Sequence, residues 1–458
     1  MDDLTNFGGT AEERDIRHHF HAYTNARRHM DVGPMITEEG SGIHVTDNFG
    51  RRYIEGMAGL WSVGVGFQER RLIEAATRQM EKLPFYHNFG HKSHGPAIDF
   101  AERLIDIAPV PMSKVFFTNS GSEANDTVLK MVWYRSNALG QPDKKKVIAR
   151  IRGYHGVTIA AASLTGLPYN HKSFDLPLDR VLHTGSPHYW REGRPGETEE
   201  QFATRCAEEL EALILREGPE TVAAFWAEPV MGAGGVIVPP KGYFDKIQAV
   251  LAKYDILFIA DEVICGFGRT GEMFGSTTYG IRPDVMVLSK QITSSYVPFS
   301  AIVMNDRFFG PIAEESDRIG TFGHGFTAGG HPVGAAVALE NLAIIEERDL
   351  VANARDVGAH FRARLEGLAS SPLVGEIRGV GLIAAIELVE DKVTKSVATP
   401  GRLGTLMNTA LLRNCLISRS MTDAAAFCPP LIITRAQADE MFEIVAKSLA
   451  ELEADEGV

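Results

Sequence analysis

The sequence has 458 residues, of which 44% are hydrophobic and 23% are charged, a composition ordinary for a globular protein of two or three domains. Its 46 Lys+Arg residues are outnumbered by 59 Asp+Glu residues, so the net field repels a phosphate backbone and argues against nucleic acid as a partner. The four cysteines stand far apart without a CxxC pair, so neither a disulfide framework nor a metal centre is expected.

The N-terminus, MDDLTNFGGTAEERD, is acidic and lacks the apolar core of a targeting signal. No run in the chain approaches the roughly 20 apolar residues that cross a bilayer. We therefore expect a cytoplasmic, soluble protein with no membrane partner. Residues 42–56 predict a β-hairpin that turns at Asn48-Phe49-Gly50 and could pack with the C-terminal part of the chain.

Short apolar runs alternate with helix-like stretches between residues 113 and 305. The expected strands lie within 114–120, 145–151, 221–230, 256–263, 284–290 and 299–304, and the expected helices within 122–139, 201–218 and 242–255. Strands that are apolar on both faces and separated by amphipathic helices indicate a mostly parallel sheet covered on each side.

The pattern changes after this region to long amphipathic helices around a few short strands. The helices are expected within 331–350, 354–370 and 435–454, and a strand within 381–389. This predicts a smaller α/β domain. The expected α/β architecture therefore comprises an N-terminal segment of the small domain (1–60), a large domain (61–335) and a C-terminal small domain (336–458).

In open parallel sheets, ligands collect outside the carboxyl ends of the strands, so the residues after each apolar run are candidates for a site. The first such end, FFTNSGSEAN, places Gly121 and Ser122 where a helix would begin, and backbone N–H groups there suit a phosphate. The alternative is a plain helix cap, with Asn119 or Ser120 as the N-cap and Glu123 closing a capping box.

Two other strand ends carry ionisable groups. Asp261 and Glu262 end an apolar run, where a carboxylate needs a dedicated partner, either functional or structural. Lys290 ends the run DVMVLSK. In a cleft, desolvation would lower the pKa of this amine and make it a usable nucleophile or base, whereas at a sheet edge the lysine would simply reach solvent.

The fourth strand end, RGYHG, places Tyr154 and His155 between glycines. Rings in such a turn could stack on a flat ligand, although plain packing would also explain them. Taken together, the four ends supply the parts of a pyridoxal phosphate site: a phosphate cradle, a stacked ring, a carboxylate and an amine. The lysine forms a Schiff base, and the aspartate keeps the pyridine nitrogen protonated.

The sequence resembles the class III aminotransferases, which are fold-type I pyridoxal phosphate enzymes. The blocks that carry the resemblance are HHFHAYTN, GMAGLWSVGVG, FTNSGSEAN, YHG, EPVMGAGGVIVPP, ADEVICGFGRTG, SKQITSSYVP, HGFTAGGHPV and FCPPLIITRAQADEM, in family order. Within the family the sequence is most similar to the (S)-selective omega-transaminases, or amine:pyruvate aminotransferases. The resemblance implies a large domain around a mostly parallel sheet and a smaller α/β domain built from both chain ends.

The resemblance also implies a role for each candidate residue. Lys290 would be the Schiff-base lysine and the base that moves a proton between the substrate's α carbon and the cofactor, and Asp261 would pair with the pyridine nitrogen. The other cofactor-binding residues would be Gly121 and Ser122 on the phosphate, Val263 and Tyr154 on the two ring faces, and His155.

Thr327, in HGFTAGGHPV, corresponds to a threonine that reaches the phosphate of the neighbouring subunit's cofactor. This implies a homodimer or homotetramer with shared active sites. Without the family, a helix cap ahead of HPVGAAVAL is the simpler interpretation of Thr327.

The expected substrate-binding residues are Trp61, Phe20, Phe89 and Arg419. The arginine would clamp a substrate carboxylate through a bidentate pair and swing away for an uncharged amine. The three aromatic residues would wall the pocket for the remaining side chain, although a tryptophan in an apolar segment is ordinarily part of the core.

Family members that use glutamate and 2-oxoglutarate carry an arginine three residues before the Pro-Pro pair, where this chain has Ala426. The expected partner keto acid is therefore pyruvate. In the glutamate-using members Glu228 would pair with that arginine, so its role in this chain is open.

The expected function is ping-pong transfer of an amino group from an amine or omega-amino acid to pyruvate. A same-fold decarboxylase or aminomutase and a transaminase that uses 2-oxoglutarate remain alternatives, and the physiological amine is open. The departures from the family pattern have no account from sequence: Gln291 and Thr422 replace glycine, and Ala328-Gly329 replaces Tyr-Ser.

Overall fold

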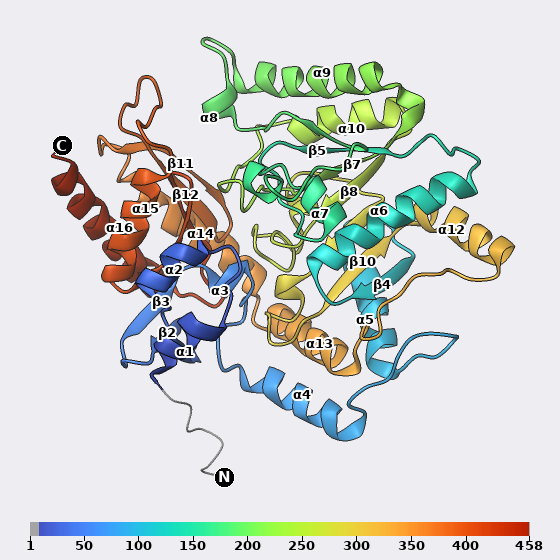
Figure 1. The fold of residues 1–458 in the computed structure, drawn as a ribbon, viewed down its shortest axis with the longest axis horizontal. Coiled ribbons are helices and arrows are strands. Elements are labelled where there is room, and N and C mark those ends of the chain that lie inside the picture. The colour runs from blue at the N-terminus through green and yellow to red at the C-terminus, as the bar shows by residue number, and fades with distance from the viewer. Residues whose placement is uncertain (1–8, 458) are drawn as a thin grey trace.

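A computed structural model describes residues 9–457 of the chain. The first eight residues of the predicted segment 1–60, and residue 458, lie outside the described residues. Figure 1 shows the N-terminal and C-terminal elements side by side on the left, and a larger region built around one sheet on the right.

The helices alternate with the strands along most of the chain. They are α1 (Ala11–His18), α2 (Ala26–Val32), α3 (Ala58–Trp61), α4 (Arg70–Lys82), α5 (Gly95–Asp106), α6 (Gly121–Ala138), α7 (Ile159–Leu164), α8 (Tyr189–Glu192), α9 (Glu199–Glu217), α10 (Tyr243–Lys253), α11 (Gly275–Thr278), α12 (Asp306–Ile319), α13 (Pro332–Glu347), α14 (Leu350–Glu366), α15 (Arg402–Arg413) and α16 (Arg435–Glu456), with short 3-10 helices η1 (Pro168–Asn170), η2 (Pro219–Thr221) and η3 (Lys290–Ile292).

The large region is organised by a seven-stranded sheet in the order β4-β10-β9-β8-β7-β5-β6. Its strands are β4 (Lys114–Thr118), β5 (Lys146–Arg150), β6 (Val181–Thr184), β7 (Val222–Ala227), β8 (Leu257–Asp261), β9 (Val285–Leu288) and β10 (Ser300–Met304). Strands β5 to β9 pair in parallel, and β10 runs antiparallel to both β4 and β9. The prediction of a mostly parallel sheet is confirmed.

Both faces of this sheet are covered, because successive strand residues point to opposite sides. On β5, Val147 and Ala149 pack in the core beneath α6, whereas Ile148 packs with residues of α9 and α10 on the other face. Every residue of β7, β8 and β9 is buried. This burial explains why the strands are continuous apolar runs in the sequence and why polar residues first appear where the strands end.

Two smaller sheets lie beside the large one. The first has the order β1-β2-β3-β13, and the second has the order β11-β12-β15-β14. Their strands are β1 (Thr37–Ser41), β2 (His44–Asp47), β3 (Arg52–Glu55), β11 (Val374–Val380), β12 (Ile383–Leu388), β13 (Leu416–Ile417), β14 (Arg419–Met421) and β15 (Ala424–Phe427). The predicted hairpin is present as β2 and β3, with Gly50 at φ 78° in its turn.

The two chain ends share a sheet, because Leu416 of β13 pairs in parallel with Ile54 of β3. The smaller part of the molecule is thus built from N-terminal and C-terminal segments together. The proposed division at residues 60 and 335 stays a prediction, and its second boundary falls inside α13. Within residues 9–457, no helix combines the length and the apolar content needed to cross a bilayer.

Candidate active site

Asp261, the last residue of β8, is buried and anchored by three hydrogen bonds. Its Oδ2 accepts from His155 Nδ1 at 2.8 Å and from Asn125 Nδ2 at 2.9 Å, and its Oδ1 accepts from the Val263 N–H at 3.1 Å. The bond from His155 requires the proton of this imidazole to sit on Nδ1. A carboxylate held in this way keeps a fixed direction at the carboxyl edge of the sheet.

Lys290 follows β9, an interior strand of the seven, and so does not lie at a sheet edge. Its φ is 50°, and within residues 9–457 its Nζ makes no hydrogen bond or ion pair. Burial lowers the pKa of this amine, and the nearby carboxylates of Asp261 and Glu228 oppose that effect. The role of Lys290 as an activated amine stays a prediction, which its interior position and its lowered pKa favour.

The N-terminus of α6 has a helix cap and also leaves backbone N–H groups that could bind a phosphate. Ser120 is the N-cap, and its side chain accepts from the Glu123 N–H at 3.2 Å. Glu123 in turn accepts from the Asn119 N–H at 2.8 Å. The N–H groups of Gly121 and Ser122 have no partner in the part of the chain that the structure describes, so both remain available to an anion.

Close packing explains the glycines of this region. A Cβ on Gly121 would lie 3.1 Å from Val263 Cγ2, and a Cβ on Gly156 would lie 2.5 Å from Ser122 Oγ. Gly156 also has φ 131°, a conformation that L side chains rarely adopt. Larger residues at either position would fill the cradle between α6, Val263 and the turn that follows β5.

The structure supplies a role for Glu228 that the sequence left open. Its Oε1 accepts from the Tyr154 N–H at 2.9 Å and its Oε2 accepts from the Gly232 N–H at 3.0 Å. Burial raises the pKa of this carboxyl. Glu228 therefore fixes the turn that carries Tyr154, whose hydroxyl accepts from Tyr23 at 3.5 Å.

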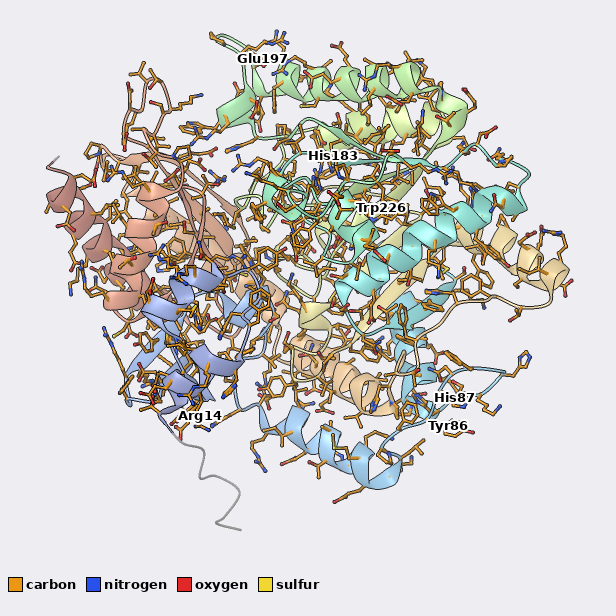
Figure 2. All side chains as sticks on the ribbon, in the orientation of Figure 1. Arg14, Tyr86, His87, His183, Glu197 and Trp226 are labelled. Atoms are coloured by element: carbon orange, nitrogen blue, oxygen red, sulfur yellow. The ribbon has the colours of Figure 1, made fainter. Side chains whose placement is uncertain are left out.

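Sequence reasoning missed two residues behind Asp261. Asn125 donates to Asp261 and to the His155 carbonyl, and its Oδ1 accepts from Trp226 Nε1 at 2.9 Å. Figure 2 shows Trp226 in the interior of the large region. Asn125 had a detectable signal, since it is a polar residue one turn after Gly121 on a buried helix face. Trp226 had none, because it stands in a continuous apolar run.

Gln291, which replaces a glycine of the family pattern, is accounted for by a buried cation. Arg269 is fully buried and donates to the carbonyls of Leu382 at 2.9 Å and Pro429 at 2.6 Å. Its third acceptor is Gln291 Oε1 at 3.1 Å, while Gln291 Nε2 donates to the Gly266 carbonyl at 2.9 Å. The glutamine, directly after Lys290 in the chain, thus supplies the acceptor for Nη2 of a buried guanidinium, whose Nε has no partner in the described chain.

Arg419 lies on β14, opposite Ala426 of β15. Its charge adds to the effect of burial that lowers the pKa of Lys290, and it partly opposes the burial that raises the pKa of Tyr154, so it lies near both. Its guanidinium has no hydrogen bond or ion pair within residues 9–457. Thr422, at the glycine position of the loop, has φ 56°. The loop is anchored beside it, because Asp423 accepts from the N–H groups at the start of α15.

The predicted aromatic wall is only partly assembled in one chain. Trp61 is buried in a cluster that includes Met421 and Cys428, and its place in the substrate pocket stays a prediction. Phe20 is 83% exposed on the segment between α1 and α2.

Phe89 and Thr327 are not placed with Lys290. Phe89, in the segment that follows Tyr86 and His87 in Figure 2, lines a hollow of about 1430 Å³ together with residues 320–326. None of Lys290, Asp261 and Tyr154 lines that hollow. Thr327 is exposed. The cap interpretation of Thr327 is wrong, because the N-cap of α13 is His331, whose Nδ1 accepts from the Val333 N–H at 3.2 Å.

The described residues fit pyridoxal phosphate. An amine without a partner can bond the aldehyde, an anchored carboxylate can face the pyridine nitrogen, and two N–H groups at the start of an 18-residue helix can hold the phosphate. The seven-stranded sheet places all three at one edge. The fold and the site together define a fold-type I aminotransferase that uses pyridoxal phosphate.

Comparison with known proteins narrows this class. A family model described as "Aminotransferase class-III" matches residues 24–449. The omega transaminase from Pseudomonas jessenii in complex with PMP is 58% identical, with a TM-score of 0.97, over 97% of this chain and 99% of that one.

Two further similarities bear on substrates. A solved structure titled "Transaminase with L-ala" is 65% identical, with a TM-score of 0.91, over 92% of this chain and 100% of that one. The mitochondrial gamma aminobutyrate transaminase 1 of Solanum lycopersicum is 50% identical over 433 residues, which are 94% of this chain and 84% of the relative. The chain belongs to the class III aminotransferase family. Within it, the chain is an omega-transaminase that uses pyridoxal phosphate.

Proposed function

We propose that this omega-transaminase moves an amino group from an amine or omega-amino acid to pyruvate in a ping-pong reaction. The observation that carries the proposal is the guanidinium of Arg419, which has no partner within residues 9–457, near Lys290, with Ala426 opposite it. One arginine can clamp one carboxylate through a bidentate pair. A second carboxylate, as in 2-oxoglutarate, finds no arginine at position 426.

Pyridoxal phosphate supplies the electron sink that makes the substrate's Cα–H bond acidic. Lys290 Nζ would take the proton from the substrate Cα and deliver it to the C4′ carbon of the bound cofactor, a role that requires a neutral amine and therefore benefits from its lowered pKa. Asp261 fixes the charge at the pyridine nitrogen, and His155 and Asn125 hold Asp261 in position.

The remaining predicted residues bind the groups around the reacting carbon. Gly121 and Ser122 hold the phosphate, Val263 and Tyr154 enclose the ring, and Glu228 keeps Tyr154 in place through its backbone. Trp61 and Phe20 form the pocket for the side chain that carries no carboxylate. Its other wall and a phosphate contact come from Phe89 and Thr327 of the partner subunit in a homodimer.

The donor follows from the same site and from the relatives. The tomato relative is named for gamma-aminobutyrate, and the solved relative with L-alanine carries the product expected when pyruvate accepts the amino group. We therefore propose that uncharged amines and omega-amino acids are both donors. A cytoplasmic location stays a prediction, since the tomato relative is named as mitochondrial.

The acceptor is tested with the variant Arg419→Ala. Turnover should be measured with pyruvate, with 2-oxoglutarate and with a neutral aldehyde as the amino acceptor. We expect the variant's kcat/KM for pyruvate to fall by about 10²-fold, the size of a lost bidentate charge pair of about 3 kcal/mol, with little change for the aldehyde.

The control variant is Arg413→Ala, which breaks a surface ion pair with Glu451 and should leave all three acceptors unchanged. If kcat/KM falls equally for pyruvate and for the aldehyde, Arg419 does not bind the substrate carboxylate. A preference of the parent enzyme for 2-oxoglutarate over pyruvate would contradict the proposal that pyruvate is the amino acceptor.

A further inference from the structure

Three histidines converge on one carboxylate in the N-terminal segment. Asp15 lies on α1, His19 and His21 lie just after it, and His29 lies on α2. Asp15 Oδ1 is 2.8 Å from His21 Nε2 and 3.0 Å from His29 Nε2, and Asp15 Oδ2 is 3.1 Å from His19 Nδ1. The rings are also close, with centroids 4.2 Å apart for His19 and His21 and for His21 and His29.

The separations match a set of metal ligands. In a tetrahedral zinc site with bonds of about 2.0–2.1 Å, neighbouring ligand atoms lie about 3.3 Å apart. The distances from the two oxygens of Asp15 are 2.8 to 3.1 Å, so the nitrogens need to move apart by only a few tenths of an ångström to admit the ion. One ligand atom from each of Asp15, His19 and His21 lies within 4.8 Å of the others. His29, from the neighbouring helix, lies 3.0 Å from Asp15 Oδ1 but outside that mutually close group.

The carboxylate of Asp15 differs from those of the other candidate metal-binding group in its ion-pair partners. The ion pairs of Asp15 within residues 9–457 are all with histidines. The other group of this kind in the described chain, His188 with Glu376 and Glu387, is already occupied. There Arg378 pairs with both carboxylates at 2.7 Å, so their charges already have a cationic partner.

We propose that Asp15, His19, His21 and His29 form a structural site for a divalent transition metal, with Zn²⁺ as the best fit. Three imidazoles and one carboxylate are ligands that Zn²⁺ favours, whereas Mg²⁺ and Ca²⁺ prefer oxygen atoms alone. Binding requires each ligating ring nitrogen to carry no proton, so any proton that now faces Asp15 must move to the other ring nitrogen or be released. The cysteine pattern gives no hint of this site, since it contains no cysteine.

A metal ion bound by these residues would also affect the active site. Its ligands bracket the segment between α1 and α2, which carries Phe20 and Tyr23. Tyr23 accepts from Asn170 Nδ2 at 2.6 Å and donates to the Tyr154 hydroxyl at 3.5 Å. A cation held by ligands from α1, the turn and α2 would fix this segment against the pocket.

The test uses the holoenzyme without a polyhistidine tag, treated with a chelator and then titrated with Zn²⁺. We expect one Zn²⁺ per chain by metal analysis, and an increase in thermal midpoint at saturation. The double variant His21→Ala/His29→Ala should raise the dissociation constant by at least about 10- to 100-fold, the range that a lost outer-shell partner alone can cost.

Two further variants keep the result decisive. His19→Ala changes a side chain that is 66% exposed and so does not threaten folding, and it should also weaken Zn²⁺ binding. His360→Ala removes a comparable surface pair, in which His360 Nε2 lies 2.8 Å from Asp439 Oδ1, and should not. If the parent binds Zn²⁺ no more tightly than the double variant, the site does not exist.

A second readout reports the connection to the pocket. Hydrogen exchange of the amides in residues 19–29 should slow when Zn²⁺ binds the parent holoenzyme and stay unchanged in the double variant. Unchanged exchange in the zinc-loaded parent would contradict the proposal that the cation fixes this segment.

Discussion

Gln291 follows the proposed catalytic lysine in the chain, but its side chain binds a buried arginine instead of the active site. Its side-chain oxygen accepts from the buried Arg269, which has no carboxylate partner in the described chain. We predict that Gln291→Leu lowers the free energy of unfolding by about 1–3 kcal/mol, because the guanidinium loses an acceptor that no water replaces. The measurement is the urea midpoint, with the exposed Gln141→Leu as the control. An unchanged midpoint would contradict this account.

Lys290 shows what sequence could and could not predict at the residue scale. The strand-end rule identified Lys290 and Asp261, since both are ionisable residues at the end of apolar runs. It could not identify Asn125, whose signal was its place on a buried helix face rather than at a strand end, or Trp226, whose hydrogen bond to Asn125 joins β7 to α6 without any local pattern. The role of Glu228 likewise depended on a turn 74 residues away in the chain.

At the scale of elements, the short helix α3 is held in a strained form. Ala58, Gly59 and Trp61 all have positive φ, of 47°, 67° and 64°. The carboxyl of Glu55, at the end of β3, accepts from the Gly59 N–H. Burial raises the pKa of Glu55 to about 7. The element that carries Trp61 is therefore tied to a buried carboxyl that titrates near neutral pH.

The raised pKa of Glu55 predicts a pH dependence of stability. Between the ordinary value of 4.5 and about 7, the folded state keeps a proton that the unfolded state has released. The stabilisation from this group is therefore present below pH 4.5 and is lost as the pH rises through 7, a change of up to about 3 kcal/mol.

The variant Glu55→Gln isolates this contribution, because an amide does not titrate. The parent's urea midpoint should fall more between pH 5 and pH 8 than that of Glu55→Gln. The exposed Glu38→Gln should behave like the parent. If the urea midpoint of Glu55→Gln falls as much as that of the parent between pH 5 and pH 8, other groups cause the pH dependence.

The elements themselves divide into predictable and unpredictable sets. Six of the seven strands of the large sheet follow from apolar runs, six of the long helices follow from amphipathic periods, and the hairpin of β2 and β3 follows from its turn. Strand β6 was not predicted, because its four residues include the polar His183 and Thr184 and make no continuous apolar run. The pairing of β13 with β3 does not, because two residues of strand joining a segment more than 350 positions away carry no local pattern. The antiparallel direction of β10 was not predictable either, because it depends on how the chain connects β9 to β10 in three dimensions.

At the scale of the whole molecule, one chain leaves its site incomplete. Phe89 lines a hollow that excludes Lys290 and Asp261, and Thr327 is exposed. If subunits exchange these residues in a homodimer, each site combines Lys290 from one chain with Thr327 from the other. The incomplete aromatic wall around Lys290 in the single chain favours this arrangement.

Mixed dimers test this arrangement. Lys290→Ala and Thr327→Asp should each be nearly inactive, the second because a carboxylate would repel the phosphate. Chains of the two variants, unfolded together and refolded, should regain activity, because every mixed dimer has one site with both native residues. No recovery, in mixtures whose mixed dimers are verified by mass, would place Thr327 outside a shared site.

The most direct test of the proposed reaction is alanine formation from pyruvate by the parent and by Lys290→Ala. With an amine donor, the parent should form alanine and the matching carbonyl product in equal amounts. The variant should form none and should lack the absorbance of lysine-bound cofactor. Carbon dioxide release, turnover that needs no keto acid, or alanine formation that survives in Lys290→Ala would contradict amino transfer at this lysine.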